Sequence, residues 1–167
     1  MKKMVLAVAA TLALAGSMPA QNPSPNDEFI RLDFSLKEMD AGKVVNTRAY
    51  QMMARVNDTG MSSIRSGGRV PVAGEKGFTY IDVGTNLDVR RVSRLKDDVV
   101  LELTAEVSGA MEIGEGKPVA ANPPSVRQTR WNSSVLIPLR KPVVVFSSED
   151  PASRRQLQLE VTATPMR

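Results

Sequence analysis

From Phe29 onward, apolar and polar side chains alternate along the chain with a period of two. The apolar positions of the first such segment are Ile30, Leu32, Phe34 and Leu36. Side chains two residues apart lie on the same face of a β-strand, so the pattern predicts a strand with one buried face. Residues 50–56 repeat the alternation, with Tyr50, Met52, Ala54 and Val56 on the more apolar face. They predict a second strand.

The middle of the chain predicts a turn at residues 57–60 and a short strand at residues 61–65. Ser66, Gly67 and Gly68 are expected to interrupt that strand before a further strand-like phrase begins at Arg69. Glycine is rare within regular strands, which is why we expect a break there.

The clearest pair of strands covers residues 81–89 and 99–107, separated by the polar residues 96–98. Two alternating segments joined by a short polar loop are typical of an antiparallel hairpin. We expect Leu87, Leu101 and Leu103 to face the core.

The C-terminal part predicts fewer regular elements. Residues 109–124 are rich in proline and glycine and predict a long exposed loop, and residues 147–153 predict a turn. Strands are expected at residues 127–139, 142–146 and 156–163, with Val135 facing the core. No segment has a convincing helical period, and residues 35–45 could hold one helical turn at most. The sequence therefore predicts an all-β fold, a small antiparallel β-sandwich of seven or eight strands.

The N-terminus has the features of a signal peptide. Lys2 and Lys3 precede an apolar stretch of about a dozen residues, and small residues follow it. That stretch is shorter than the roughly 20 residues a spanning helix needs, so a membrane anchor is the weaker interpretation. We expect a signal-peptide helix at residues 1–20, a mature protein that begins between Gly16 and Gln21, a flexible linker at residues 21–28, and one domain at residues 29–167.

Composition narrows the classes of function. The net charge of +4 falls to +2 without the leader, and the remaining basic residues are scattered, so we predict no nucleic-acid binding. With no His and no Cys, the chain has neither a serine–histidine triad nor a thiol nucleophile, and it lacks the usual zinc ligands. Paired carboxylates such as Asp97 and Asp98 lie in predicted turns. We predict no enzymatic activity, no cofactor and no metal site.

Four short phrases occur in the order and spacing of the core β-domain of secretins, the ring-forming outer-membrane channels of bacterial secretion and type IV pilus systems. The chain resembles that family over residues 45–165. The residues that carry the resemblance are Gly67, Arg69, Val70, Pro71, Val83, Gly84, Leu87, Glu106, Val107, Ser108 and Asn132. Two positions depart from the family pattern: Arg91 stands where a proline is usual, and Ser147 and Ser148 replace the glycines that normally end the last apolar strand.

The resemblance implies an exported, non-enzymatic envelope protein of the periplasm or outer membrane, serving as a component or accessory of a type II secretion or pilus system. It also implies self-association or protein partners at strand edges, with membrane contact only as part of a multimer. The alternative is a free-standing periplasmic β-sandwich that binds another protein and forms no pore. Gly84 leaves two interpretations open: a neighbouring subunit approaches it closely, or it relieves strand twist within one chain.

Overall fold

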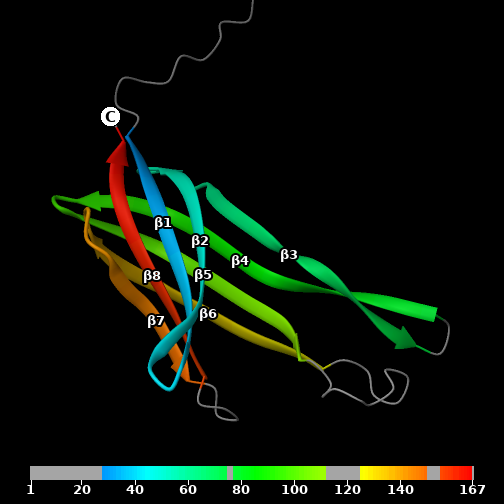
Figure 1. The fold of residues 1–167 in the computed structure, drawn as a ribbon. Helices are drawn as coiled ribbons and strands as arrows, with labels where there is room; N and C mark the ends of the chain where they lie inside the picture. Colours follow the sequence, from blue (N-terminus) through cyan, green and yellow to red (C-terminus); the bar gives the residue numbers. More distant parts are fainter. Residues whose placement is uncertain (1–27, 75–76, 112–124, 150–154, 167) are drawn as a thin grey trace, which may run out of the picture.

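The computed structural model describes residues 28–74, 77–111, 125–149 and 155–166. The expected signal peptide and most of the linker lie outside these residues. Eight strands form two four-stranded sheets (Figure 1). The strands are β1 (Phe29–Asp40), β2 (Lys43–Arg55), β3 (Met61–Gly74), β4 (Gly77–Leu95), β5 (Asp98–Met111), β6 (Ser125–Pro138), β7 (Val143–Glu149) and β8 (Arg155–Met166).

Sheet A has the strand order β2-β1-β8-β7 and sheet B the order β3-β4-β5-β6, and neighbouring strands in both are antiparallel. The sheets pack face to face, with the strands of one running across those of the other (Figure 1). The predicted all-β sandwich is therefore confirmed. Within the described residues, no helix is long and apolar enough to cross a membrane.

The core lies between the two sheets and consists of the apolar faces predicted from the alternation. Sheet A contributes Ile30, Leu32, Phe34, Leu36, Met52, Ala54, Leu159, Val161 and Ala163, and sheet B contributes Leu87, Val89, Val92, Val99, Leu101, Leu103, Ala105 and Ile137. Val135 is half-buried and packs against this core, so its predicted face is also correct. The predicted hairpin is β4 and β5, which are joined by a turn at Lys96 and Asp97.

Several predicted boundaries are wrong. The chain does not break at Ser66, Gly67 and Gly68, because β3 runs through them while paired with β4. The predicted loop begins too early, since β5 extends to Met111, and β7 likewise continues to Glu149 through part of the predicted turn. The rest of both segments lies outside the described residues. Residues 35–45 form no helical turn: they belong to β1 and β2 and the tight turn between them.

Candidate functional site

Sheet B divides into two ribbons at the level of Gly84 and Ser108. β4 pairs with β5 from Thr85 onward, but residues 77–84 pair with β3 alone. Residues 108–111 of β5 in turn pair with β6 alone. At the point of division, which we call the fork, the Gly84 N–H donates to the Ser108 hydroxyl at 3.0 Å. The β3–β4 ribbon, residues 67–74 and 77–84, extends beyond sheet A (Figure 1).

Two glycines allow the strands of this ribbon to approach at the fork. Gly84 lies directly opposite Gly67 and has a φ of 151°, a conformation that L side chains rarely adopt. A Cβ on Gly84 would overlap the Ser66 carbonyl oxygen and the Gly67 Cα, and a Cβ on Gly67 would overlap the Val83 carbonyl oxygen. The close approach is therefore between two strands of the same chain. This geometry favours the interpretation in which Gly84 serves the fold of one chain.

An open, mainly polar depression lies at the fork. Six of the sequence-predicted residues line it: Gly67, Arg69, Val83, Gly84, Glu106 and Ser108. Arg69 forms an ion pair with Asp82 across the ribbon at 3.0 Å. The resemblance phrases, although distant in sequence, thus converge on one place in sheet B.

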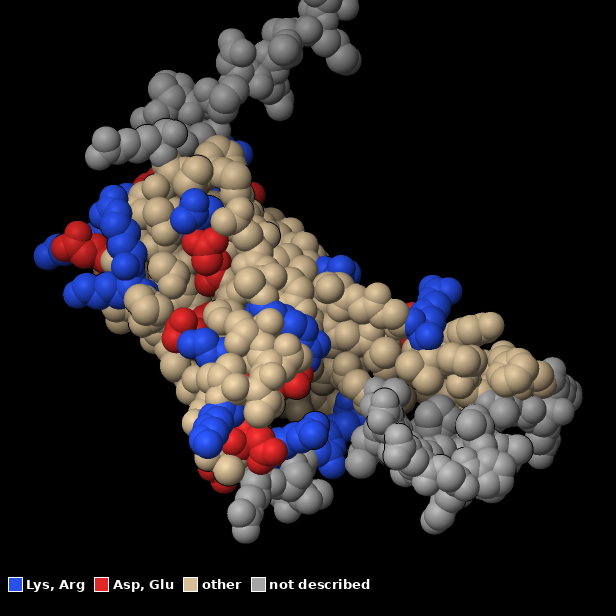
Figure 2. Space-filling view, viewed as in Figure 1, with Lys and Arg blue, Asp and Glu red and all other residues tan. Residues whose placement is uncertain are grey.

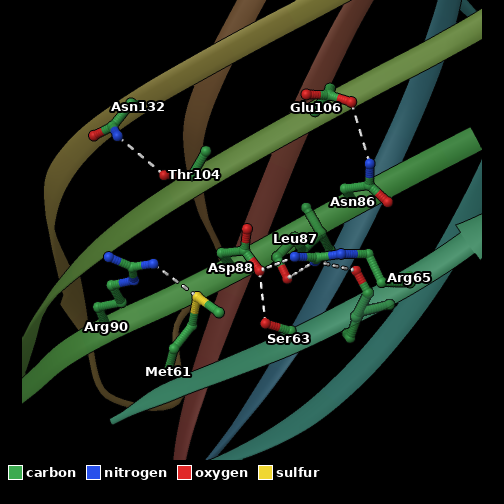
Figure 3. Close-up of polar contacts among 11 residues, drawn as sticks. Met61, Ser63, Arg65, Asn86, Leu87, Asp88, Arg90, Thr104, Glu106 and Asn132 are labelled. Atoms are coloured by element: carbon green, nitrogen blue, oxygen red, sulfur yellow. Dashed lines mark hydrogen bonds and ion pairs between the residues drawn. The ribbon is translucent and has the colours of Figure 1, made fainter. Parts of the chain in front are cut away.

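The other five predicted residues lie elsewhere. Val70 and Pro71 lie farther along the β3–β4 ribbon, opposite Ile81 and Tyr80. Leu87 is buried in the core and Val107 packs against it. Asn132 lies on β6, where its side-chain amide donates to the Thr104 hydroxyl at 3.0 Å (Figure 3).

A ladder of polar contacts that the sequence analysis did not predict crosses the outer face of sheet B (Figure 3). Asp88 accepts hydrogen bonds from Ser63 and pairs with Arg65, at 2.7 Å in each case. Asn86 donates to Glu106 at 3.1 Å, which extends the ladder to β5. Asn86, Asp88 and Glu106 alternate with core residues of their strands, but their partners are set by the register of neighbouring strands, which the local sequence pattern does not give.

The environment of Asp88 shifts its pKa. Burial raises the pKa, but hydrogen bonds from Ser63 and Arg65 and the positive charges of Arg65 and Arg90 outweigh burial, so the pKa is below its ordinary value. A carboxyl whose pKa is lower in the folded state stabilises the fold above its unfolded pKa of about 3.9. That contribution is lost as the pH falls through the folded pKa.

Asp88→Asn is therefore expected to destabilise the protein at pH 6 and to do so less at pH 3, because pH 3 lies below the unfolded pKa of about 3.9 and part of the stabilising contribution is lost there. The measurement is urea unfolding at both pH values, followed by the fluorescence of Trp131, the only tryptophan in the chain. An equal free-energy difference between wild type and variant at the two pH values would contradict the assignment.

Four strands have one side without a strand partner in the described residues: β2 and β7 in sheet A, and β3 and β6 in sheet B. β2 lies against β3 and β7 against β6, so each flank of the sandwich has one edge from each sheet. The edge strands also carry exposed large apolar side chains. These are Val44, Val45 and Met53 on β2, Met61 on β3, Leu136 on β6 and Val144 on β7.

Charge on the visible face of the molecule is mixed, with Lys and Arg interspersed among Asp and Glu (Figure 2). Among the described residues, no group of three or more carboxylates is placed to hold a metal ion. What the geometry offers is main-chain pairing capacity at strand edges, together with a polar depression where sheet B divides.

No protein-family model and no curated protein sequence matches the chain. Its fold is similar to that of the Salmonella SPI-1 type III secretion injectisome secretin InvG, with a TM-score of 0.55 and 10% identity over 84% of this chain and 65% of that chain. A structure of the injectisome basal body proteins InvG, PrgH and PrgK gives the same TM-score and identity, with 46% of that chain covered.

The Klebsiella pneumoniae type II secretion system outer membrane complex of PulD, PulS and the PulC HR domain gives a TM-score of 0.52 at 13% identity, covering 84% of this chain and 38% of that chain. The chain thus spans less than two thirds of each of these similar chains. At such identities the likeness concerns the fold. The described residues have the fold of a secretin-like core β-domain.

Proposed function

We propose that this protein is an exported, non-enzymatic envelope protein whose copies join edge to edge into a secretin-like ring, as a component or accessory of an outer-membrane secretion or pilus system. The observation that carries the proposal is the pair of open edges on each flank of the sandwich. Support also comes from the fold shared with InvG.

The number of strands determines how such copies can join. In a sheet of four antiparallel strands the two edge strands run in opposite directions, so β6 of one copy placed beside β3 of the next continues the antiparallel pattern. The same holds for β7 and β2 in sheet A. Each flank of the sandwich has one edge strand from each sheet. A single head-to-tail contact between two copies therefore extends both sheets. Heterologous contacts of this kind generate rings when the rotation closes.

The edges are also suited to pairing by their length and side chains. β3 and β6 each have 14 residues, so a neighbour has a long ladder to pair with. Soluble proteins usually protect such edges with charges or short strands, because an exposed apolar edge pairs with other chains. Here the described edge strands retain apolar side chains at the surface, and a neighbouring copy would cover them.

A matched pair of lysine variants tests the proposal. Leu136 on the edge strand β6 is 52% exposed, and Leu95 at the end of the inner strand β4 is 59% exposed. Leu136→Lys places an ammonium group on the edge strand at the proposed seam and is expected to reduce multimer formation strongly, because lysines on edge strands oppose pairing with another chain. Leu95→Lys has a similar change in chemistry away from the seam and is expected to assemble normally.

Size-exclusion chromatography with light scattering, applied to the full chain extracted from the envelope, gives the oligomeric state. A multimer for wild type and Leu95→Lys, with a smaller species for Leu136→Lys, supports the ring. A wild-type monomer at high concentration would instead favour a free-standing periplasmic domain that binds another protein. A specific observation keeps that second function in view: the core residues of both sheets are buried within a single chain.

A further inference from the structure

The two sheets are joined at one end of the sandwich by main-chain contacts. The N–H of Asn57, just after β2, donates to the Val92 carbonyl of β4 at 2.7 Å. The N–H of Arg140, just after β6, donates to the Ala163 carbonyl of β8 at 2.8 Å. Arg94 of β4 also pairs with Glu28 at the start of sheet A. We call this the joined end.

At the opposite end, a side chain connects the sheets. Arg48 of the edge strand β2 extends to Thr85 of β4, with 3.5 Å between a terminal guanidinium nitrogen and the threonine hydroxyl oxygen. Thr85 is fully buried, and Arg48 also pairs with Glu38 of β1. A hydrogen bond of 3.5 Å is at the long limit of the interaction, so this connection is weak.

The position of the Arg48 side chain between the sheets also has an energetic cost. Its Nε is buried and has no hydrogen-bond partner. A buried donor without an acceptor costs free energy, because its hydrogen bond to water is lost and no protein acceptor replaces it. This cost offsets part of what the Arg48 contacts with Thr85 and Glu38 contribute, so they hold the two sheets together by a small net free energy.

The core is also less completely closed near this end. A narrow apolar crease runs between the sheets, and its lining includes Ala105, Trp131, Phe146 and Leu157. Trp131 and Phe146, from different sheets, meet there with ring centroids 5.5 Å apart. Both rings remain half-buried. Fewer contacts hold the layers together here than a filled core would provide.

We infer that the sandwich opens locally at this end: sheet A moves away from sheet B about the joined end, and Arg48 is the latch that holds the two layers closed. Opening exposes the crease while the main-chain contacts of the joined end stay in place. Local opening of this kind requires less free energy than global unfolding, and it occurs where buried contacts are few.

Thiol labelling of the full chain tests this inference, because the protein has no cysteine of its own. Ala105→Cys places a thiol in the crease, and Ala163→Cys places one in a fully buried position at the joined end. Adding Arg48→Met, which keeps the apolar stem but removes the guanidinium, is expected to raise the labelling rate of Ala105→Cys by about tenfold. The rate for Ala163→Cys is expected to change little.

Two further variants make the result specific. Thr85→Val removes the hydroxyl from the other side of the contact and should accelerate labelling at Ala105→Cys in the same way. Arg31→Met removes an arginine from an ion pair with Asp33 on the outer face of sheet A and should leave labelling unchanged. Equal acceleration at both cysteines by Arg48→Met would show global destabilisation and overturn the inference, as would no acceleration at either.

Discussion

Replacing Gly84 with valine is expected to destabilise the isolated chain by on the order of 2–4 kcal/mol, combining backbone strain with a steric clash. At a φ of 151°, a β-branched residue is strained whatever space surrounds it. The added Cβ would also overlap the Ser66 carbonyl oxygen and the Gly67 Cα of β3. Because both obstacles are main-chain atoms, no side-chain rotation relieves them. The two strands of the ribbon, β3 and β4, must therefore move apart at the fork.

Gly68→Val is the matched control. Gly68 is the next residue after Gly67 on the same strand, yet a Cβ there would meet no atom within 4 Å. Urea unfolding followed by Trp131 fluorescence should therefore show a large fall in midpoint for Gly84→Val and a small change for Gly68→Val. If Gly84→Val instead kept the wild-type midpoint and lost only multimer formation, the close approach would serve a neighbouring subunit.

The faces of the strands could be predicted from the sequence because a strand has a period of two and one buried side. Ile30, Leu101 and Leu103 lie in the core for that reason. The positions at which strands begin and end were harder to predict, since the glycines at 67 and 68 suggested a break. Gly67 instead lets two paired strands approach, which depends on Gly84, a residue 17 positions later in the chain, whereas a Cβ on Gly68 would meet open space.

The candidate site was predicted only in part for a similar reason. The resemblance phrases supplied Gly84, Glu106 and Ser108, which do meet at the fork. The ladder around Asp88 and the contact between Arg48 and Thr85 were not predicted, because each joins segments far apart in sequence. Arg48 lies just before the alternating segment that starts at Tyr50, so no local pattern marked it as facing the other sheet.

Leu103→Ala should lower the free energy of unfolding by about 2–5 kcal/mol, the range for removing a buried leucine and leaving a residual cavity. Leu103 is fully buried at the centre of sheet B, between Val89 on β4 and Ser133 on β6. The ladder holds β4 in place and the hydrogen bond between Asn132 and Thr104 holds β6, so the sheet has little freedom to collapse into the space.

The matched control for that variant is Leu95→Ala, since Leu95 is 59% exposed at the end of β4 and its truncation should change stability by less than about 0.5 kcal/mol. Urea unfolding gives both values from the same Trp131 signal. Similar small effects for the two leucines would mean that Leu103 faces solvent and that β5 is shifted by one residue, because a single-residue slip moves every side chain of a strand to the opposite face. A large effect for Leu103 alone places the core between the two sheets.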